Sequence, residues 1–171
     1  MSPGVSKVVR VYVPCTLSQL RDIVTAGGVG PVPFTAHAVT DRLRAEDPDA
    51  DDEVLEYTAT TAAAQASLGL IAEGPRRRVV VAVDVPSVVP VETDDPSTVQ
   101  VDDPVPFRQL AAVLLDDADA AADVAAAAEA WPAAAEGDPQ AAEVVERCLD
   151  RELGWYAPDE IGDLLDAEAK A

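Results

Sequence analysis

The clearest pattern along the chain is an alternation of valines with other residues near its start. In residues 7–14, KVVRVYVP, three valines share one face while Arg10 and Tyr12 share the other, which predicts a β-strand. Thr16 and Gln19 then have the spacing of a capping box, and an apolar stripe at helical intervals runs on to Gly27. A helix is therefore predicted directly after the strand.

Later segments switch between strand-like and helix-like patterns. Residues 34–39 favour a short strand, and Thr40 is expected to cap a short helix. Residues 53–73 carry apolar or small side chains at steps of three and four, which predicts a long helix. Continuous apolar runs at 79–85 and 110–115 predict two strands that are covered on both faces.

The last third is rich in alanine. Residues 118–131 predict a helix that Pro132 ends, and Asp138 is expected to cap a second helix, from Pro139 to about Arg151, that forms a hairpin with the first. The remaining predictions are an irregular crossover at 86–96, a short edge strand at 98–101, a short aromatic strand at 153–157 and a final helix from Pro158.

Strands and helices that alternate without a strict rhythm predict an α/β fold of two or three layers, with a mixed sheet of five or six strands. An α+β arrangement is the alternative. Because 171 residues is the size of one domain, we expect a single domain over residues 1–171, with flexible ends at 1–6 and 167–171.

Charge narrows the choice of partner. The chain has 32 acidic and 12 basic residues, a formal net charge of −20, so nucleic acid should be repelled. The acidic surface either attracts a basic protein partner or reflects solubility and base composition. No apolar stretch resembles a signal peptide or approaches the ~20 residues of a membrane span, so we expect a cytoplasmic protein that does not enter membranes.

Few residues offer catalytic or metal-binding chemistry. Cys15 stands where a strand becomes a helix, a position that can activate a thiol, but the single histidine, His37, carries no motif and is expected to be structural. Cys15 and Cys148 fit no zinc spacing and are expected to remain unpaired. No nucleotide-binding or nucleophile-elbow motif occurs, so no cofactor and no metal are predicted.

Carboxylates after the predicted strands are the candidates for a polar site. Asp84 and Asp116 would lie together at the carboxyl edge of a parallel sheet, where they could hold magnesium. Asp117 and Asp119 compete with this interpretation, because both suit the start of the next helix. The basic cluster Arg76–Arg78 could hold a phosphate, but pairing with neighbouring carboxylates is favoured.

Residues 153–158 contain the aromatic pair Trp155 and Tyr156, which suits either a core or an interface. Successive strand residues face opposite sides, so one of the two should be buried and the other exposed. We expect Trp155 to be the buried one.

Several of these segments resemble one protein family. The resemblance rests on RVYVP at 10–14, AVT at 38–40, LEY at 55–57, the strand at 79–86 and ELGWYAPDE at 152–160. The family is an uncharacterised one of high-G+C Gram-positive bacteria, described as a domain of unknown function. The resemblance implies a single-domain bacterial protein and supplies no activity; the family pattern has alanine in place of Cys15.

We therefore expect a non-enzymatic cytoplasmic interaction or regulatory module with an acidic surface and a protein partner. The alternative is a small enzyme that uses carboxylate and tyrosine groups at the carboxyl edge of the sheet. A pocket that contains at least two of Tyr12, Asp84, Asp116 and Tyr156 would favour the enzyme, and a flat apolar patch around Trp155 would favour the module. The oligomeric state is left open.

Overall fold

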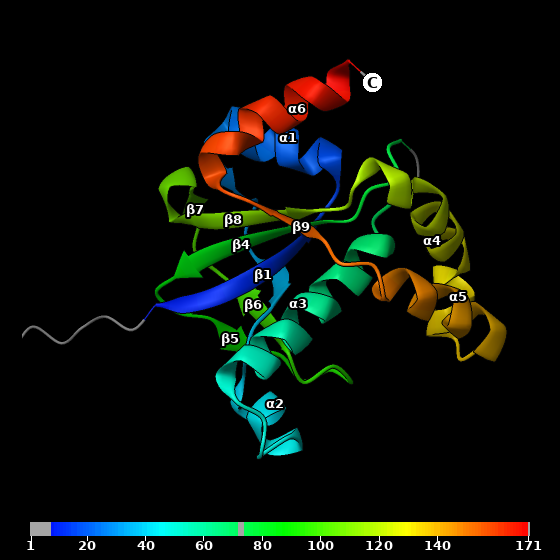
Figure 1. Cartoon of the computed structure of the whole chain (residues 1–171). Coiled ribbons are helices and arrows are strands. Elements are labelled where there is room, and N and C mark those ends of the chain that lie inside the picture. Colours follow the sequence, from blue (N-terminus) through cyan, green and yellow to red (C-terminus); the bar gives the residue numbers. More distant parts are fainter. Residues whose placement is uncertain (1–7, 72–73, 171) are drawn as a thin grey trace, which may run out of the picture.

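A seven-stranded sheet forms the centre of the computed structural model, which describes residues 8–71 and 74–170. The strands are β1 (Val9–Cys15), β2 (Gly28–Val29), β3 (Phe34–His37), β4 (Val79–Val85), β5 (Val89–Pro90), β6 (Thr98–Val101), β7 (Val105–Pro106), β8 (Leu110–Leu115) and β9 (Gly154–Tyr156). The large sheet has the order β5-β6-β3-β1-β4-β8-β9, and β2 pairs separately with β7 (Figure 1).

The α/β class is confirmed, but the sheet differs from the prediction. It has seven strands, and its neighbouring strands are antiparallel instead of mixed. Residues 98–101 form a strand as predicted, but β6 is not at the edge because β5 pairs with its outer side. A strand of two residues leaves no periodic pattern in the sequence, so β5 was missed within the predicted crossover.

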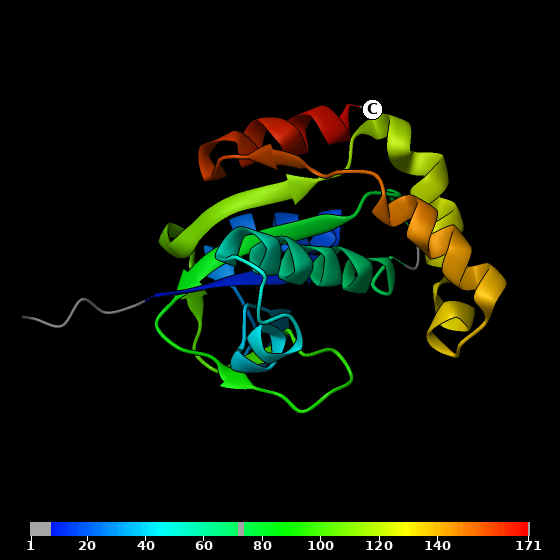
Figure 2. The ribbon, with the colours of Figure 1, turned by 60° about the horizontal axis from the view of Figure 1, so that its bottom comes forward.

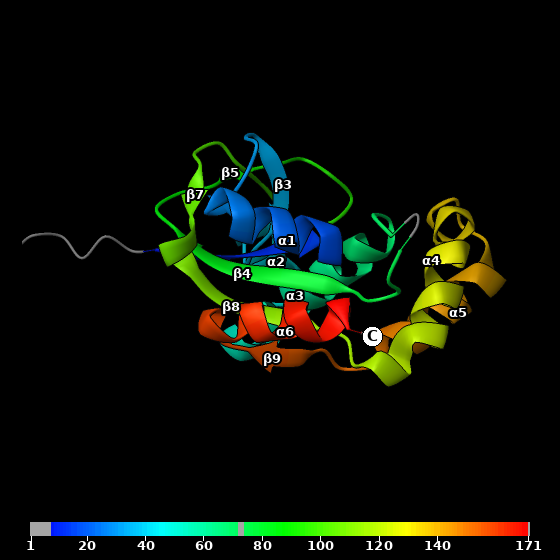
Figure 3. The ribbon, with the colours of Figure 1, turned by 90° about the horizontal axis from the view of Figure 1, so that it is seen from above.

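Helices cover both faces of the sheet and one of its ends. They are α1 (Leu17–Ala26), α2 (Asp41–Glu46), α3 (Asp52–Leu68), α4 (Ala121–Ala135), α5 (Pro139–Leu149) and α6 (Ile161–Ala169). Helices α1 and α6 lie side by side over one face (Figure 3). Helix α3 crosses the opposite face (Figure 2). The predicted hairpin of α4 and α5 lies beyond one end of the sheet.

Side-chain caps set several helix starts, as predicted. Thr16 Oγ1 accepts a hydrogen bond from the Gln19 N–H (3.2 Å), and the Gln19 side chain accepts one from the Thr16 N–H (3.0 Å), which completes the capping box of α1. Thr40 and Asp138 cap α2 and α5 through side-chain oxygens that accept hydrogen bonds from backbone N–H groups of the first turn.

Two predicted helix ends were wrong. Pro132 lies inside α4, which continues to Ala135, because a proline removes one hydrogen bond near a helix end while packing against α5 still holds the last turn. Helix α3 ends at Leu68, short of the predicted end at 73, and residues 72–73 lie outside the described part of the chain.

The two faces of the sheet are packed with different side chains. Toward α1 and α6, the strands present Val11, Val81 and Val113. Toward α3 they present small residues such as Ala82 and Ala112, which meet alanines of the helix. Small side chains on both surfaces let α3 approach the sheet closely, which suits a chain with few aromatic residues.

A buried ion pair fixes the end of the sheet nearest the α4–α5 hairpin. Arg78, just before β4, donates from Nε and Nη2 to the two carboxylate oxygens of Asp116, just after β8, at 2.9 and 2.8 Å. The Arg78 backbone N–H adds a third bond to Asp116 (2.7 Å), and both side chains are almost fully buried. Arg77 pairs with Glu168 in α6. Pairing with carboxylates is thus confirmed for Arg77 and Arg78.

Cys15 and Cys148 are both free, as predicted. Within residues 8–71 and 74–170, no helix combines the length and apolar character needed to cross a bilayer. Residues 1–6, which we expected to be flexible, lie outside the described residues, whereas residues 167–169 of the expected flexible tail belong to α6.

Candidate functional site: a cleft where the sheet divides

Strands β1 and β3 are neighbours that barely pair. A single residue pair, Tyr12 with His37, joins them, whereas β1 pairs with β4 along its whole length and β3 pairs with β6 over four residues. Beyond Tyr12 and His37 the two strands diverge. The sheet is therefore continuous on the β4 side of β1 and divided on the β3 side.

Proline explains why this ladder stops. Along an antiparallel strand, the backbone groups of successive residues point to opposite neighbours. Ser67 Oγ accepts a hydrogen bond from the Val79 N–H (3.2 Å) and donates to the Cys15 carbonyl (2.7 Å), which shows that the backbone of Cys15 faces β4. Pro14 therefore faces β3, and it has no N–H to donate.

Thr35 of β3 forms the side of the gap opposite Pro14. The Ala38 N–H donates to the Ser97 carbonyl (2.9 Å), so alternation directs the backbone of Ala36 to β6 and that of Thr35 toward β1. In the register set by Tyr12 and His37, Thr35 would stand opposite Pro14. Thr35 is exposed, and its N–H and C=O therefore border the gap without a ladder partner in β1.

The far wall depends on two adjacent glycines at the end of α1. Gly27 has φ +79°, the left-handed conformation that ends the helix and turns the chain. A Cβ atom on Gly28 would lie 2.3 Å from the Val105 carbonyl oxygen, so only glycine lets β2 pair with β7 there. The Phe107 N–H also donates to the Gly27 carbonyl (2.8 Å).

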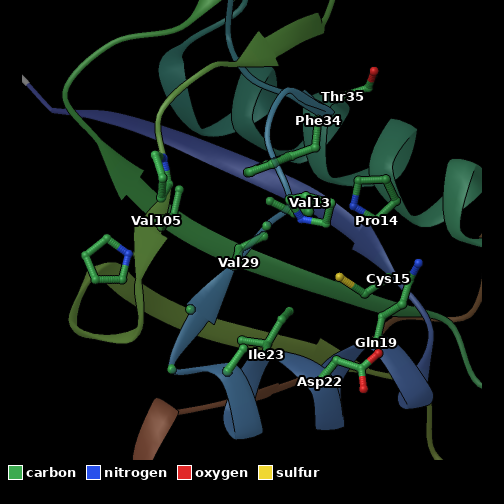
Figure 4. A pocket seen from close by; sticks show the side chains of 17 residues that line it. Val13, Pro14, Cys15, Gln19, Asp22, Ile23, Val29, Phe34, Thr35 and Val105 are labelled. Atoms are coloured by element: carbon green, nitrogen blue, oxygen red, sulfur yellow. The ribbon is translucent and has the colours of Figure 1, made fainter.

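These elements enclose a cavity of about 800 Å³, which we call the β1–β3 cleft. Apolar side chains line most of it, with Val13, Phe34 and Val105 on different walls (Figure 4). Gln19, Asp22 and Thr35 supply the polar side chains of the lining, and Asp22 is its charged one. A cavity of this size, mostly apolar with a few polar groups, is typical of a ligand-binding site.

The chemistry of the lining suits binding more than catalysis. Burial raises the pKa of the Cys15 thiol to about 12, so the thiol stays protonated near neutral pH and is a poor nucleophile. The Gln19 side chain is occupied by the cap of α1. In the described residues, no group of three or more His, Cys, Asp or Glu side chains is placed to hold a metal ion.

A second cluster contains the residue types of a serine-hydrolase triad but not its geometry. His37 Nδ1 lies 2.9 Å from Ser97 Oγ and 3.3 Å from Asp95 Oδ2, and Ser97 Oγ donates to Asp95 Oδ1 (2.6 Å). In a triad the serine and the aspartate contact different ring nitrogens, whereas here both contact Nδ1. His37 is buried and hydrogen-bonded, as expected of a structural histidine.

The structure does not bring the two predicted carboxylates together. Because β4 and β8 are antiparallel, Asp84 at the end of β4 and Asp116 at the end of β8 lie at opposite ends of the sheet. Asp84 accepts two hydrogen bonds from Arg10 (2.8 and 2.9 Å), and Asp116 is held by Arg78. The two carboxylates therefore do not share one edge of the sheet, as they would in a parallel sheet.

Tyr12 is also placed away from the cleft. It is buried under α3, and burial raises the pKa of its hydroxyl despite a hydrogen bond with Thr60 that lowers it. The predicted capping by Asp117 is not seen, because its side chain makes no cap hydrogen bond, while Asp119 lies in the first turn and pairs with Arg151 at 3.8 Å.

The predicted burial of Trp155 was wrong, and Tyr156, which was expected to be exposed, is half-buried. Trp155 is 66% exposed, because it lies on the edge strand β9 and faces the α3 side, where α3 packs mainly on β1, β3 and β4. Tyr156 points to the other face and packs against the core beneath α1 and α6. Apolar character alone could not show which face of the edge strand was covered.

A comparison of the sequence with protein-family models matches residues 9–165 to a family model. The chain belongs to DUF6912, a family of unknown function. The resemblance to a family of unknown function is thus confirmed, and the match includes every residue that lines the β1–β3 cleft. No curated protein and no solved structure matches the chain.

Proposed function

We propose that this protein is a non-enzymatic binding module and that the β1–β3 cleft is its binding site. The observation that carries the proposal is the division of the sheet. A cavity of about 800 Å³ lies within the fold where β1 and β3 would otherwise pair, and its walls are built from apolar side chains. Such a wall contributes affinity by removing apolar ligand surface from water.

The charge of the protein limits what the cleft takes up. Asp22 lines the cleft, and Asp102 and Asp103 directly precede the lining residue Pro104. The whole chain has a formal net charge of −20. This field attracts cations and repels anions. Neutral or cationic apolar ligands therefore suit the cleft, whereas phosphates and nucleic acid do not.

Two leucine substitutions test the site. A Cβ atom at Gly30, which lines the cleft, or at Gly162 in α6 would meet no other atom within 4 Å, so neither change strains the backbone by contact. We expect the neutral apolar dye Nile red to bind the wild type and Gly162→Leu alike. Gly30→Leu should lower the affinity measured by fluorescence titration at least about tenfold, because it adds a bulky side chain at a residue that lines the cavity.

The exposed aromatic surface needs its own control. Trp155→Ala removes the most exposed large apolar side chain without touching the cleft. Dye binding that is lost in Trp155→Ala but unchanged in Gly30→Leu would contradict the proposal and place the binding surface on β9. Thermal melts of each variant establish that the fold is retained.

A further inference from the structure

The rims of the β1–β3 cleft carry backbone groups that an apolar small molecule would leave unused. Thr35 directs an N–H and a C=O toward the gap, and Pro14 directs a C=O from the opposite side. These groups belong to strands and have strand spacing. Their natural complement is the backbone of another extended chain, which adds to a sheet through main-chain hydrogen bonds.

We propose that the cleft takes up an extended polypeptide segment that has apolar side chains and a Lys or Arg, and that the segment pairs with the backbone of Thr35. The inference rests on the proposed function and names the class of its ligand. Val13, Phe34 and Val105 supply the apolar contacts, and Asp22 supplies the charge that a basic side chain would meet.

Proline limits the length of this pairing. The residues two positions before and after Thr35 are Pro33, which directly precedes β3 and has no N–H, and His37, which is already paired with Tyr12. Thr35 therefore presents one donor and one acceptor to an incoming strand. The segment is expected to be short and to depend strongly on one pair of main-chain hydrogen bonds.

The specificity of the segment follows from charge. An acidic peptide would meet Asp22 and the net charge of −20, and repulsion would slow its association. A basic peptide should associate faster at low salt, and that advantage should shrink at high salt because the Debye length falls to about 3 Å at 1 M.

The test uses a random dodecapeptide display library panned on the full chain. We expect enriched peptides that combine aliphatic residues with Lys or Arg. Their affinity, measured by fluorescence polarisation, should fall at least about tenfold in Gly30→Leu and stay unchanged in Gly162→Leu. Ala26→Trp adds bulk at an exposed helical position on the α1 wall and should also weaken peptide binding, independently of Gly30.

Two further readouts separate strand pairing from simple apolar contact. N-methylation of individual peptide nitrogens should abolish binding at the position that pairs with Thr35 and have little effect at positions that face neither Thr35 nor the Pro14 carbonyl. Asp22→Asn should weaken the basic peptides several-fold at low salt and little at high salt.

The outcomes distinguish this inference from the proposed function. If Nile red binds in a Gly30-dependent way but panning enriches no peptide, or enriches peptides that tolerate N-methylation at every position, the cleft is a binding site and the peptide inference is wrong. Enriched peptides that are acidic would also overturn it. If neither the dye nor a peptide responds to Gly30→Leu, both proposals fail.

Discussion

Strand β1 has two sides that behave differently. On the β4 side, seven residue pairs join the strands without interruption, and β4 pairs in turn with β8, with one shift of register between Ala82 and Val83. On the β3 side a single pair joins the strands and an apolar cavity opens. Both sides are antiparallel contacts of the same strand, so the difference comes from the residues that face each side. Valines fill β4, whereas Pro14 of β1 faces the gap and Pro31 and Pro33 precede β3.

A sheet can thus contain a cavity suited to ligand binding where the ladder between two neighbouring strands, here β1 and β3, is incomplete. Unpaired strand edges are usually protected in proteins, and proline is a common means because it cannot donate a hydrogen bond. Here the prolines stop β1 and β3 from closing on each other while Thr35 keeps its own N–H. The continuous side gives the fold its stability, and the divided side remains open to a ligand.

The largest effect on stability is expected at the buried ion pair between Arg78 and Asp116, which joins the start of β4 to the end of β8. Asp116→Ala leaves the buried Arg78 guanidinium without its carboxylate, which should cost about 3–5 kcal/mol in the free energy of unfolding measured with urea. The double variant Arg78→Met, Asp116→Leu should recover most of that loss, because no unpaired charge remains buried.

The exposed ion pair between Arg10 and Asp84 is the matched control for this prediction. Asp84→Ala should change the free energy of unfolding by only about 0–1 kcal/mol, since water already screens that pair. A loss at Asp116 no larger than that at Asp84 would contradict the role given to the buried pair.

A smaller difference in the free energy of unfolding is expected between a valine substituted in β4 and one substituted in the wall of the cleft. Val81→Ala, in the middle of β4, should cost about 2 kcal/mol, because two methyl groups leave a closely packed core. Val29→Ala, in the cleft wall, should cost about 1 kcal/mol or less, because one side of Val29 already lacks packing partners. Equal costs in chemical denaturation would mean that the cleft wall is packed as tightly as the core.

The smallest effect is expected on stability at low pH, through the carboxyl group of Asp95. Burial alone would raise the pKa of Asp95, but hydrogen bonds from His37 and Ser97 outweigh it and lower the pKa to about 2. A carboxyl with a depressed pKa stabilises the fold above its unfolded pKa, near 4, and loses that contribution as the pH falls toward 2. The stability advantage of the wild type over Asp95→Asn should therefore be constant above about pH 4 and shrink below it. An advantage that is unchanged down to pH 2 would contradict this.

Local sequence patterns predicted most elements but not how they assemble. The capping box of α1 and the apolar runs of β4 and β8 are local signals, so their predictions were confirmed. Strand order and direction depend on contacts far apart in the chain, and for this reason an antiparallel sheet replaced the expected mixed one. The same error placed Asp84 and Asp116 at one edge.

The cleft itself could not be predicted, because it depends on where β3 leaves β1. Two local signals were present: the triplet PVP occurs at both 31–33 and 104–106, and residues 27–30 have the sequence GGVG. Paired glycines and prolines do indicate backbone that cannot join a regular ladder. They do not indicate which strands will be kept apart.

The backbone groups of Thr35 face the open gap, whereas those of its neighbour Ala36 face β6. Amide hydrogen exchange of the free protein, resolved by residue with NMR, tests this difference directly. We expect the Thr35 N–H to exchange at least about 100-fold faster than the Ala36 N–H, relative to their unstructured rates, because the Ala36 N–H is directed at a paired strand and the Thr35 N–H is directed at the gap. Equal protection of the two amides would show that β1 and β3 close over the cleft, and would contradict this expectation.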